Sequence, residues 1–128
     1  MDKRIPIITL TGSGRFVNLG NPLAVELERL GCIVFWIFIS LYSTSTQGGF
    51  RRADKAMADM VYIHKIQLSD SMVVLDYENY IGESTEREIC YAKTIRIPIF
   101  YISRIGNRPL TIYNLTVKSM LKEGKHND

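Results

Sequence analysis

The sequence has few cysteines, little net charge and no long hydrophobic run, and each absence excludes a class of protein. Its two cysteines, Cys32 and Cys90, do not make a disulfide framework, and we expect both to be buried free thiols. The longest apolar run, Cys32–Ile39, has 8 residues, whereas a membrane-spanning helix needs about 20. The net charge of +3 is too small to predict a nucleic-acid-binding protein.

Signals for export, metals and cofactors are also missing. The chain begins Met1-Asp2-Lys3-Arg4 and has no apolar stretch followed by a small-residue cleavage site, so we expect no signal peptide and a cytoplasmic protein. No His or Cys cluster has the spacing of metal ligands, and there is no Walker loop, dinucleotide fingerprint or nucleophile elbow. The sequence therefore predicts neither a bound metal nor a cofactor.

What remains is the pattern of one folded domain. Apolar residues make up 46% and charged residues 23% of the 128 residues, which suits a single domain over 1–121 with a polar tail over 122–128. Short apolar segments alternate with amphipathic ones. The pattern predicts strands at 5–10, 32–40, 72–75 and 97–102, and helices at 22–30, 52–68, 85–95 and 110–121. In the first of these helices Asn21 would be the N-cap and Pro22 the first residue.

This alternation of strands and helices predicts an α/β fold, in which a parallel sheet lies between two layers of helices. Ligands of such sheets bind beyond the carboxyl ends of the strands, which here means the loops at 11–16, 40–51 and 76–84. The apolar face of the helix at 52–68 is expected to carry Met57, Met60, Val61, His64 and Leu68. We interpret His64 as a core or rim histidine and not as a catalytic one.

The first loop, Thr11-Gly12-Ser13-Gly14-Arg15-Phe16, has features of an anion-binding turn. Glycines allow the backbone to approach a ligand closely, and an arginine can bind phosphate through two hydrogen bonds. The same residues also fit an ordinary strand-to-helix turn with an exposed arginine. The loop alone does not decide between the two.

The second candidate is the segment Tyr80–Glu88. Thr85 and Glu88 have the spacing of a capping box, in which each side chain bonds the other's backbone N–H at the start of a helix. Alternatively, Glu88 lies in the first turn of that helix and acts as a carboxylate nucleophile or base, as in glycosyl chemistry. Asp70 ends a helix and Asp76 follows a predicted strand, and they also fit a turn residue and a loop carboxylate respectively. Asp76 is the better candidate for a second carboxylate of the site, because it lies at the carboxyl end of a strand.

Four segments together resemble a known family. They are Leu10–Phe16, Ile66–Asp70, Tyr80–Ala92 and Ile97–Ile99. Over roughly Ile5–Ile102 the chain is similar to the nucleoside 2-deoxyribosyltransferase-like superfamily, and in particular to small bacterial and phage members with the string Tyr-Ile-Gly-Glu-Ser-Thr-x-x-Glu-Ile. The resemblance implies a flavodoxin-like, Rossmann-like three-layer sandwich with a sheet of five strands. The residues themselves indicate four, so a fifth would lie near 40–50 or beyond Asn107.

The resemblance also implies an activity. Enzymes of this superfamily, which include 2′-deoxynucleoside 5′-phosphate N-hydrolases, cleave the N-glycosidic bond of nucleosides or their 5′-phosphates and pass the sugar to water or to another base. Glu88 would be the nucleophile, with Asp70 and Asp76 beside it. The loop would hold sugar and base, with Phe16 stacking, and phosphate would be bound nearby. The implied substrate-binding residues are Gly12, Ser13, Gly14, Arg15, Phe16, Gly82 and Ser84.

One position departs from the family. Its enzymes carry a second catalytic aspartate where this chain has Tyr62, and Asp59 lies three residues earlier. A tyrosine with an ordinary pKa near ~10 is a poorer proton relay than a carboxyl group. A module that binds a nucleotide without turning it over is therefore the alternative function. Members of the family form dimers or larger assemblies, so we also expect a homo-oligomer.

Overall fold

The sheet has the predicted parallel arrangement. The computed structural model describes residues 4–36 and 52–127, and the side chains of residues 4–36 and 56–122. Within these residues the four parallel strands lie in the order β2-β1-β3-β4. They are β1 (Ile7–Thr11), β2 (Ile33–Phe35), β3 (Ser71–Val74) and β4 (Ile99–Tyr101). The order is that of flavodoxin-like sheets, which confirms the predicted fold class.

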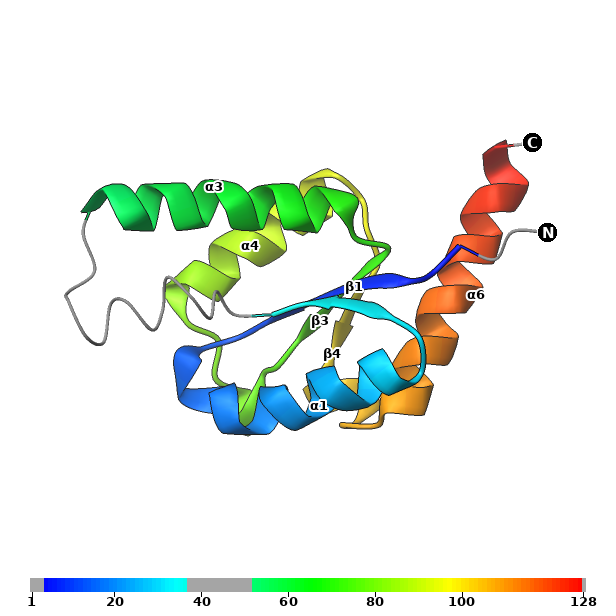
Figure 1. Cartoon of the computed structure of the whole chain (residues 1–128), viewed down its shortest axis with the longest axis horizontal. Helices are drawn as coiled ribbons and strands as arrows, with labels where there is room; N and C mark the ends of the chain where they lie inside the picture. The colour runs from blue at the N-terminus through cyan, green and yellow to red at the C-terminus, as the bar shows by residue number, and fades with distance from the viewer. Residues whose placement is uncertain (1–3, 37–51, 128) are drawn as a thin grey trace.

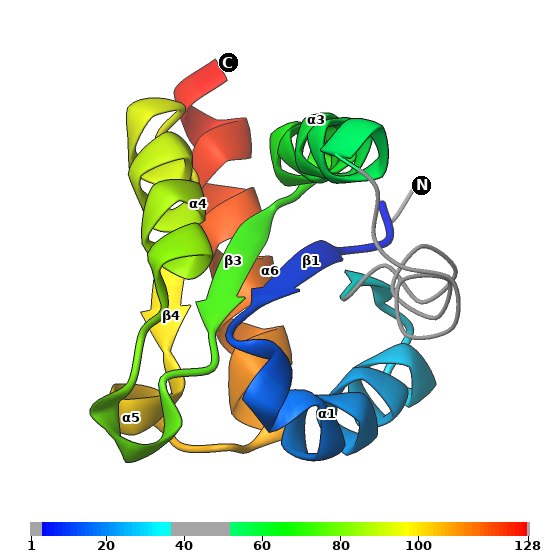
Figure 2. The same ribbon diagram turned by 90° about the vertical axis from the view of Figure 1, so that its left-hand side faces the viewer.

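Helices cover both faces of the sheet (Figures 1 and 2). They are α1 (Val17–Arg29), α3 (Arg52–Leu68), α4 (Glu83–Thr94), α5 (Ile102–Ile105) and α6 (Pro109–Asn127). One layer contains α1 with the beginning of α6, and the opposite layer contains α3 and α4. Two short 3₁₀ turns, η1 (Gly14–Phe16) and η2 (Tyr77–Asn79), follow β1 and β3 at the carboxyl edge of the sheet.

The two faces of the sheet differ in chemistry because side chains alternate along each strand. Ile8 and Leu10 of β1 pack with α1, whereas Thr9 and Thr11 are absent from that apolar cluster. In β3, Val73 packs with α1, whereas Met72 and Val74 pack with α3 and α4. Thr9 bonds Ser69 just after α3, and Thr11 bonds Glu88 of α4. The α3/α4 side of β1 therefore holds buried hydroxyl groups.

The start of α1 differs from the prediction. The helix begins at Val17, so Pro22 is an interior residue and Asn21 is not the N-cap. The Asn21 side chain instead accepts a hydrogen bond of 2.7 Å from Nε1 of Trp36. Gly20 is buried against the same indole ring, since a Cβ there would lie 2.4 Å from Cζ2 of Trp36. A tertiary contact has thus replaced the local capping interaction.

The bounds predicted for α3 are confirmed, but the predicted buried face is wrong. The side chains buried against the sheet are Ala58, Tyr62 and Ile66, which follow one another at intervals of four residues. His64 is exposed, with Nδ1 2.9 Å from the carbonyl oxygen of Met60. The exposed large apolar residues of this helix are Met57, Met60, Val61 and Leu68. The helix carries two apolar stripes, and the stripe with the two methionines faces outward.

The remaining differences lie at element ends. Residues 37–40 of the second predicted strand and the predicted loop at 40–51 lie outside the described residues, as does the position near 40–50 for a fifth strand. A fifth strand beyond Asn107 is excluded, because α6 occupies Pro109–Asn127 and runs past the predicted helix end at residue 121. None of the helices in the described part of the chain is long and apolar enough to span a membrane.

Candidate functional site

Glu88 is not part of a capping box. Helix α4 begins at Glu83, and its N-cap is Gly82, which makes no side-chain capping bond. Thr85 is therefore the third helical residue and is buried, and Glu88 lies in the second turn and not in the first. The carboxylate of Glu88 instead accepts a hydrogen bond at Oε1 from the Thr11 hydroxyl. The local signal for a cap is overridden because the helix starts two residues earlier than predicted.

Packing of α4 and the end of β1 brings the two residues together. Helix α4 buries Thr85, Ile89 and Ala92 toward α3 and the sheet. Glu88 immediately precedes Ile89 and is half-buried at the margin of this face. Thr11 is the last residue of β1, and its buried side chain lies on the α3/α4 side of the strand. The carboxylate thus lies at the carboxyl end of β1, next to β3, where flavodoxin-like folds bind ligands.

Tyr62 is the third member of this cluster. Its side chain is buried, and its hydroxyl donates a hydrogen bond to the carbonyl oxygen of Leu10. Burial and the negative charge of Glu88 both raise the pKa of Tyr62 well above its ordinary value, and a hydrogen bond with Thr11 opposes them only in part. The hydroxyl therefore stays protonated at neutral pH. Tyr62 is thus close enough to Glu88 to feel the charge of its carboxylate.

The glycine loop after β1 is tightly built. A Cβ on Gly12 would lie 3.0 Å from Cβ of Leu75 and 3.2 Å from its carbonyl oxygen, so glycine lets the segments after β1 and β3 approach closely. The Leu75 N–H donates to the Thr11 carbonyl oxygen at 2.8 Å, which joins the same two segments. Ser13 caps the η1 turn, since its Oγ accepts from the Arg15 N–H at 3.2 Å. Gly14 is the first residue of that turn.

Two aromatic contacts connect this loop to the segment after β3. The exposed Arg15 guanidinium lies 3.7 Å from the ring centroid of Tyr80, which is a cation–π contact. Phe16 is only 4% exposed and meets Tyr77 and Tyr80 edge to face, with centroids 5.3 and 6.2 Å apart. Phe16 is therefore a core residue that holds the two loops together. Its expected role as a stacking surface for a ligand base is wrong, because the ring is covered.

The remaining predicted binding residues lie at the start of α4. Gly82 is the N-cap, and its carbonyl oxygen accepts the Glu86 N–H at 2.9 Å. Ser84 is exposed, lies one turn before Glu88, and accepts a hydrogen bond of 3.2 Å from Arg87. Backbone N–H groups of this first turn have no partner within the helix, and they attract negative charge. Ser84 and these N–H groups lie one turn before Glu88 on the same helix.

Asp76 lies at the correct edge of the sheet but makes internal contacts. It is buried, and its two carboxylate oxygens accept from the backbone N–H of Ser103 at 2.9 Å and from its hydroxyl at 2.5 Å. These bonds fix the segment after β3 to the beginning of α5. The geometry indicates a residue that positions the loop carrying Tyr80. It does not place the carboxylate of Asp76 against Glu88.

Asp70 lies at the opposite edge of the sheet. Its side chain accepts hydrogen bonds of 2.8 Å from the backbone N–H of Ile7 and from the Arg4 guanidinium. Ile7 is the first residue of β1, whereas Thr11, the partner of Glu88, is the last. Four residues of extended strand, about 13 Å, separate the two ends. The expectation that Asp70 stands beside Glu88 is therefore wrong, and Asp70 secures the N-terminal segment.

Among the described residues no group of three or more His, Cys, Asp and Glu side chains could hold a metal ion. At the carboxyl edge of the sheet the structure places a carboxylate with two hydroxyl groups, and an arginine on an aromatic ring. Sequence reasoning did not single out Thr11 and Tyr80. The alternation of β1 was a usable signal for Thr11, since it places Thr9 and Thr11 on one face. For Tyr80 the sequence held no such signal.

No protein-family model matches the chain. No curated protein matches it either. The resemblance to the nucleoside 2-deoxyribosyltransferase-like superfamily therefore stays a prediction from the sequence, and the site has to be interpreted from its own geometry.

Proposed function

We propose that the protein cleaves the N-glycosidic bond of a nucleoside or nucleoside 5′-monophosphate, with Glu88 as the nucleophile. The observation that supports this most directly is the hydrogen bond from Thr11 to Glu88. It holds the carboxylate at the carboxyl end of β1 instead of at the N-terminus of its own helix. A structural cap would need no such partner on the sheet.

In the proposed mechanism a carboxylate oxygen of Glu88 attacks C1′ of the sugar while the bond to the base breaks. The transition state has oxocarbenium character, which a nearby negative charge stabilises. A glycosyl ester on Glu88 results, and water or a second base then attacks C1′ and releases the enzyme. Thr11 holds the carboxylate in one orientation during both steps, so the geometry is set before the substrate arrives.

A phosphate group on the substrate is supported by two features. Arg15 is exposed at the same edge, and its contact with Tyr80 limits the directions that the guanidinium can take. Ser84 and the first-turn N–H groups of α4 offer further donors to an anion. Because Arg15 and Ser84 suit a phosphate group on the substrate, we favour water as the acceptor of the sugar.

The alternative is a module that binds a nucleotide without cleaving it. The bond from Tyr62 to the Leu10 carbonyl favours this alternative, because the tyrosine proton is already held by an acceptor. In that case Thr11 and Glu88 would bind a sugar hydroxyl group, and Arg15 would bind the phosphate.

A panel assay with matched variants tests the proposal. Release of base is measured from ribonucleosides, deoxynucleosides and their 5′-monophosphates with the wild-type protein, Glu88→Gln and Glu86→Gln. Glu86 is exposed on the same helix, so its variant controls for loss of a carboxylate from α4. Activity that survives in Glu86→Gln and disappears in Glu88→Gln supports the mechanism. If no protein releases base from these substrates or from nucleotides with a cationic base, but a nucleotide raises the melting temperature of all three, the binding module is the correct function.

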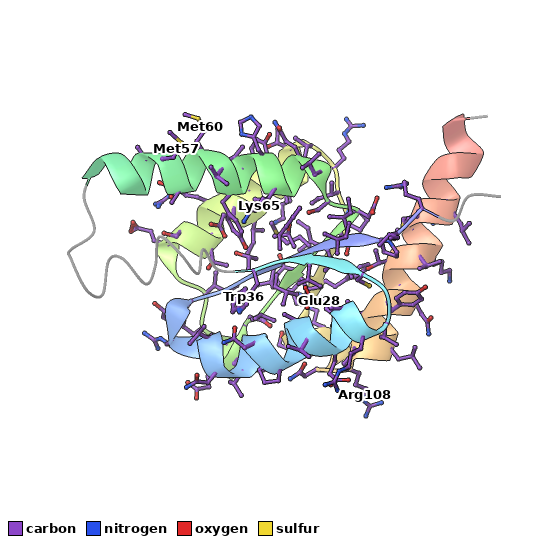
Figure 3. The ribbon with its side chains drawn as sticks, viewed as in Figure 1. Glu28, Trp36, Met57, Met60, Lys65 and Arg108 are labelled. Atoms are coloured by element: carbon purple, nitrogen blue, oxygen red, sulfur yellow. The ribbon has the colours of Figure 1, made fainter. Side chains whose placement is uncertain are left out.

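The outward face of α3 supports the proposal that the chain forms a homodimer. Met57, Met60 and Leu68 are 54%, 56% and 63% exposed, and Figure 3 shows Met57 and Met60 on the side away from the sheet. Large exposed apolar patches are typical of interaction sites. The stripe is also symmetric about its midpoint, because Met57 and Leu68 are equally far from it, as are Val61 and His64. A second α3 packed antiparallel would therefore meet the same stripe, as a two-fold interface requires.

We also propose that the protein is cytoplasmic. Cys32 is buried and Cys90 is exposed, and both are free thiols. The prediction that Cys90 is buried is therefore wrong. An exposed thiol persists in the reducing cytoplasm, whereas oxidising compartments favour its conversion to a disulfide.

A further inference from the structure

The groups near Glu88 that can donate a proton limit which base this site can release. When a neutral base leaves C1′, its ring nitrogen takes the electron pair of the broken bond and becomes an anion unless it is protonated. Enzymes supply that proton from a positioned acid, usually a carboxyl or imidazole group, and this contributes about 10²–10⁴-fold to the rate. The identity of the group next to the nucleophile therefore limits the leaving group.

The group that the structure places there is the Tyr62 hydroxyl. It donates to the carbonyl oxygen of Leu10, an acceptor fixed in the middle of the sheet. A proton in that bond points toward the backbone carbonyl oxygen. The raised pKa of Tyr62 also makes its phenol a weaker acid than an ordinary tyrosine. Tyr62 is thus a poor donor to a leaving base on both geometric and chemical grounds.

Four other carboxyl groups within the described part of the chain lie in different surroundings. Asp76 accepts two hydrogen bonds from Ser103, and Asp70 is at the amino edge of the sheet. Glu83 is exposed and pairs with Arg87 at 3.5 Å. Asp59 is exposed on α3, one turn before Tyr62. In the sequence, the segment 37–51 that follows β2 contains no Asp, Glu or His.

We propose that the leaving group is a heterocycle that is already positively charged while it is bonded to C1′ through its ring nitrogen, such as a pyridinium or an N7-alkylated purine. This rests on the proposed N-glycosidase function of Glu88 and narrows its substrate class. A cationic base leaves as a neutral molecule and needs no proton. A site with a fixed carboxylate nucleophile and a committed tyrosine is sufficient for that reaction.

The step balances without any further reactant except water. A bond forms between a Glu88 oxygen and C1′ while the C1′–N bond breaks, and its electron pair neutralises the positive ring. The carboxylate charge is consumed in the glycosyl ester. Water then attacks C1′, which regenerates the Glu88 carboxylate, gives the free sugar and releases one proton to solvent.

Matched substrates separate charge from shape. The probes are 7-methylguanosine 5′-monophosphate against guanosine 5′-monophosphate, and nicotinamide mononucleotide against uridine 5′-monophosphate, with uncatalysed rates subtracted at pH 6.5. The first pair differs only by the methyl group that fixes the positive charge. We expect kcat/KM for the cationic member of each pair to exceed that for the neutral member by about 100-fold or more, the factor that a missing general acid withholds.

Three variants make each outcome decisive. Glu88→Gln abolishes cleavage of the cationic probes if the nucleophile is correct. Tyr62→Asp lowers the ratio of cationic to neutral cleavage at least about 10-fold, because a carboxyl group can protonate a neutral base. Tyr62→Phe keeps the ring and serves as a second test if the aspartate variant does not fold. We expect it to leave the ratio of cationic to neutral cleavage unchanged. A ratio that rises in Tyr62→Phe shows that the tyrosine is a proton donor and overturns the proposal.

Different results would overturn the leaving-group assignment and the N-glycosidase function. Glu88-dependent cleavage of neutral nucleotides at rates equal to the cationic ones overturns the leaving-group assignment and leaves the N-glycosidase function intact. If Asp59→Asn selectively removes that neutral activity, Asp59 is the acid and the assignment is likewise wrong. Absence of cleavage for every probe overturns the N-glycosidase function itself.

Discussion

The hydroxyl of Thr11 donates a hydrogen bond to the carboxylate of Glu88, although the two residues are 77 positions apart in the sequence. One is the last residue of β1, and the other lies in the second turn of α4. The bond fixes a half-buried negative charge at the carboxyl edge of the sheet, beside the buried ring of Tyr62. An ionisable side chain held in this way at the usual ligand-binding edge is typical of a functional residue.

Replacing Thr11 by valine tests that bond. Valine keeps the shape and removes the donor, so Glu88 loses a partner while the packing of β1 is preserved. We expect a loss of about 1.5–3 kcal/mol in the free energy of unfolding, as for a bond to a charged group. Base release should fall about 10-fold or more, because the nucleophile loses its fixed orientation. Thr94→Val, which removes an exposed bond to the Cys90 carbonyl, is the control. Equal stability and activity in both variants would contradict the proposed role of Thr11.

Strands were the most predictable part of this fold. Their segments are short and rich in branched residues, which suits a sheet covered by helices on both sides. The bounds of α3 followed from its length and periodicity. The buried face of α3 could not be predicted in the same way, because Ala58, Tyr62 and Ile66 are together less hydrophobic than the outward stripe. Contact with the hydroxyl-bearing side of β1 selects the stripe that contains Tyr62.

The site was predictable only in part. The motif around Glu88 predicted a carboxylate at the carboxyl edge of the sheet, and the structure places both Glu88 and the glycine loop after β1 at that edge. Asp70 was misplaced, because its partners Arg4 and Ile7 are 66 and 63 positions away and no local pattern reveals them. Asn21 was misread for the same reason, since its partner Trp36 is distant in sequence. Short polar residues fit both local caps and tertiary bonds, and only the packed chain selects between them.

The contact between Gly20 and Trp36 predicts a large effect of one methyl group. A Cβ at Gly20 would lie 2.4 Å from Cζ2 and 2.8 Å from Cε2 of the indole, so the ring or the helix has to shift. We expect Gly20→Ala to lower the free energy of unfolding by about 1–3 kcal/mol, as overpacked cores do. Because Trp36 is the single tryptophan, its fluorescence follows both unfolding and any displacement of the ring.

A double-mutant cycle isolates this contact. Trp36→Phe removes the part of the ring that meets Gly20, so the added methyl group should be tolerated better in that background, with unfolding followed by circular dichroism. The coupling free energy should be about 0.5–3 kcal/mol. Additive effects of the two substitutions would show that alanine at position 20 destabilises the helix for another reason.

Stability should fall at alkaline pH partly because of Cys32. Burial raises the pKa of its thiol from 9.0 to about 11. Below pH 9 the thiol is protonated in both the folded and the unfolded chain, so its contribution is fully present. As the pH rises from 9 to about 11, the unfolded chain ionises first, and the free energy of unfolding decreases.

Urea denaturation of the wild type and Cys32→Ala under reducing conditions checks this dependence. The stability difference between the two proteins should shrink as pH rises through that range, because alanine has no thiol to ionise. Tyr62 also ionises at high pH, but it is present in both proteins and cancels in the difference. A difference that stays constant with pH would mean that the Cys32 thiol titrates normally.

Asp70 should matter for stability and not for catalysis. Asp70→Ala leaves the Ile7 N–H without its acceptor at a partly buried position, for which we expect a loss of about 1–3 kcal/mol. Arg4→Gln removes only the exposed ion pair and should cost at most about 1 kcal/mol. Activity per folded molecule should equal that of the wild type in both variants. If kcat falls in Asp70→Ala while the fraction of folded protein is unchanged, Asp70 takes part in catalysis and this prediction is wrong.

The outward stripe of α3 predicts that the protein forms a dimer through this face. We expect the wild type to form a dimer in sedimentation equilibrium, and Met60→Glu to be a monomer, because a charge buried at the centre of the interface is strongly unfavourable. Leu19→Glu, on the exposed side of α1 with a similar exposed fraction of 47%, should leave the dimer intact. The melting temperature of the wild type should also rise with protein concentration, since the dimer stabilises the folded chain by mass action. A typical interface of this kind has a dissociation constant of about 1 μM. If the wild-type protein stays monomeric at about 100 times that concentration, this face is excluded as a self-association site.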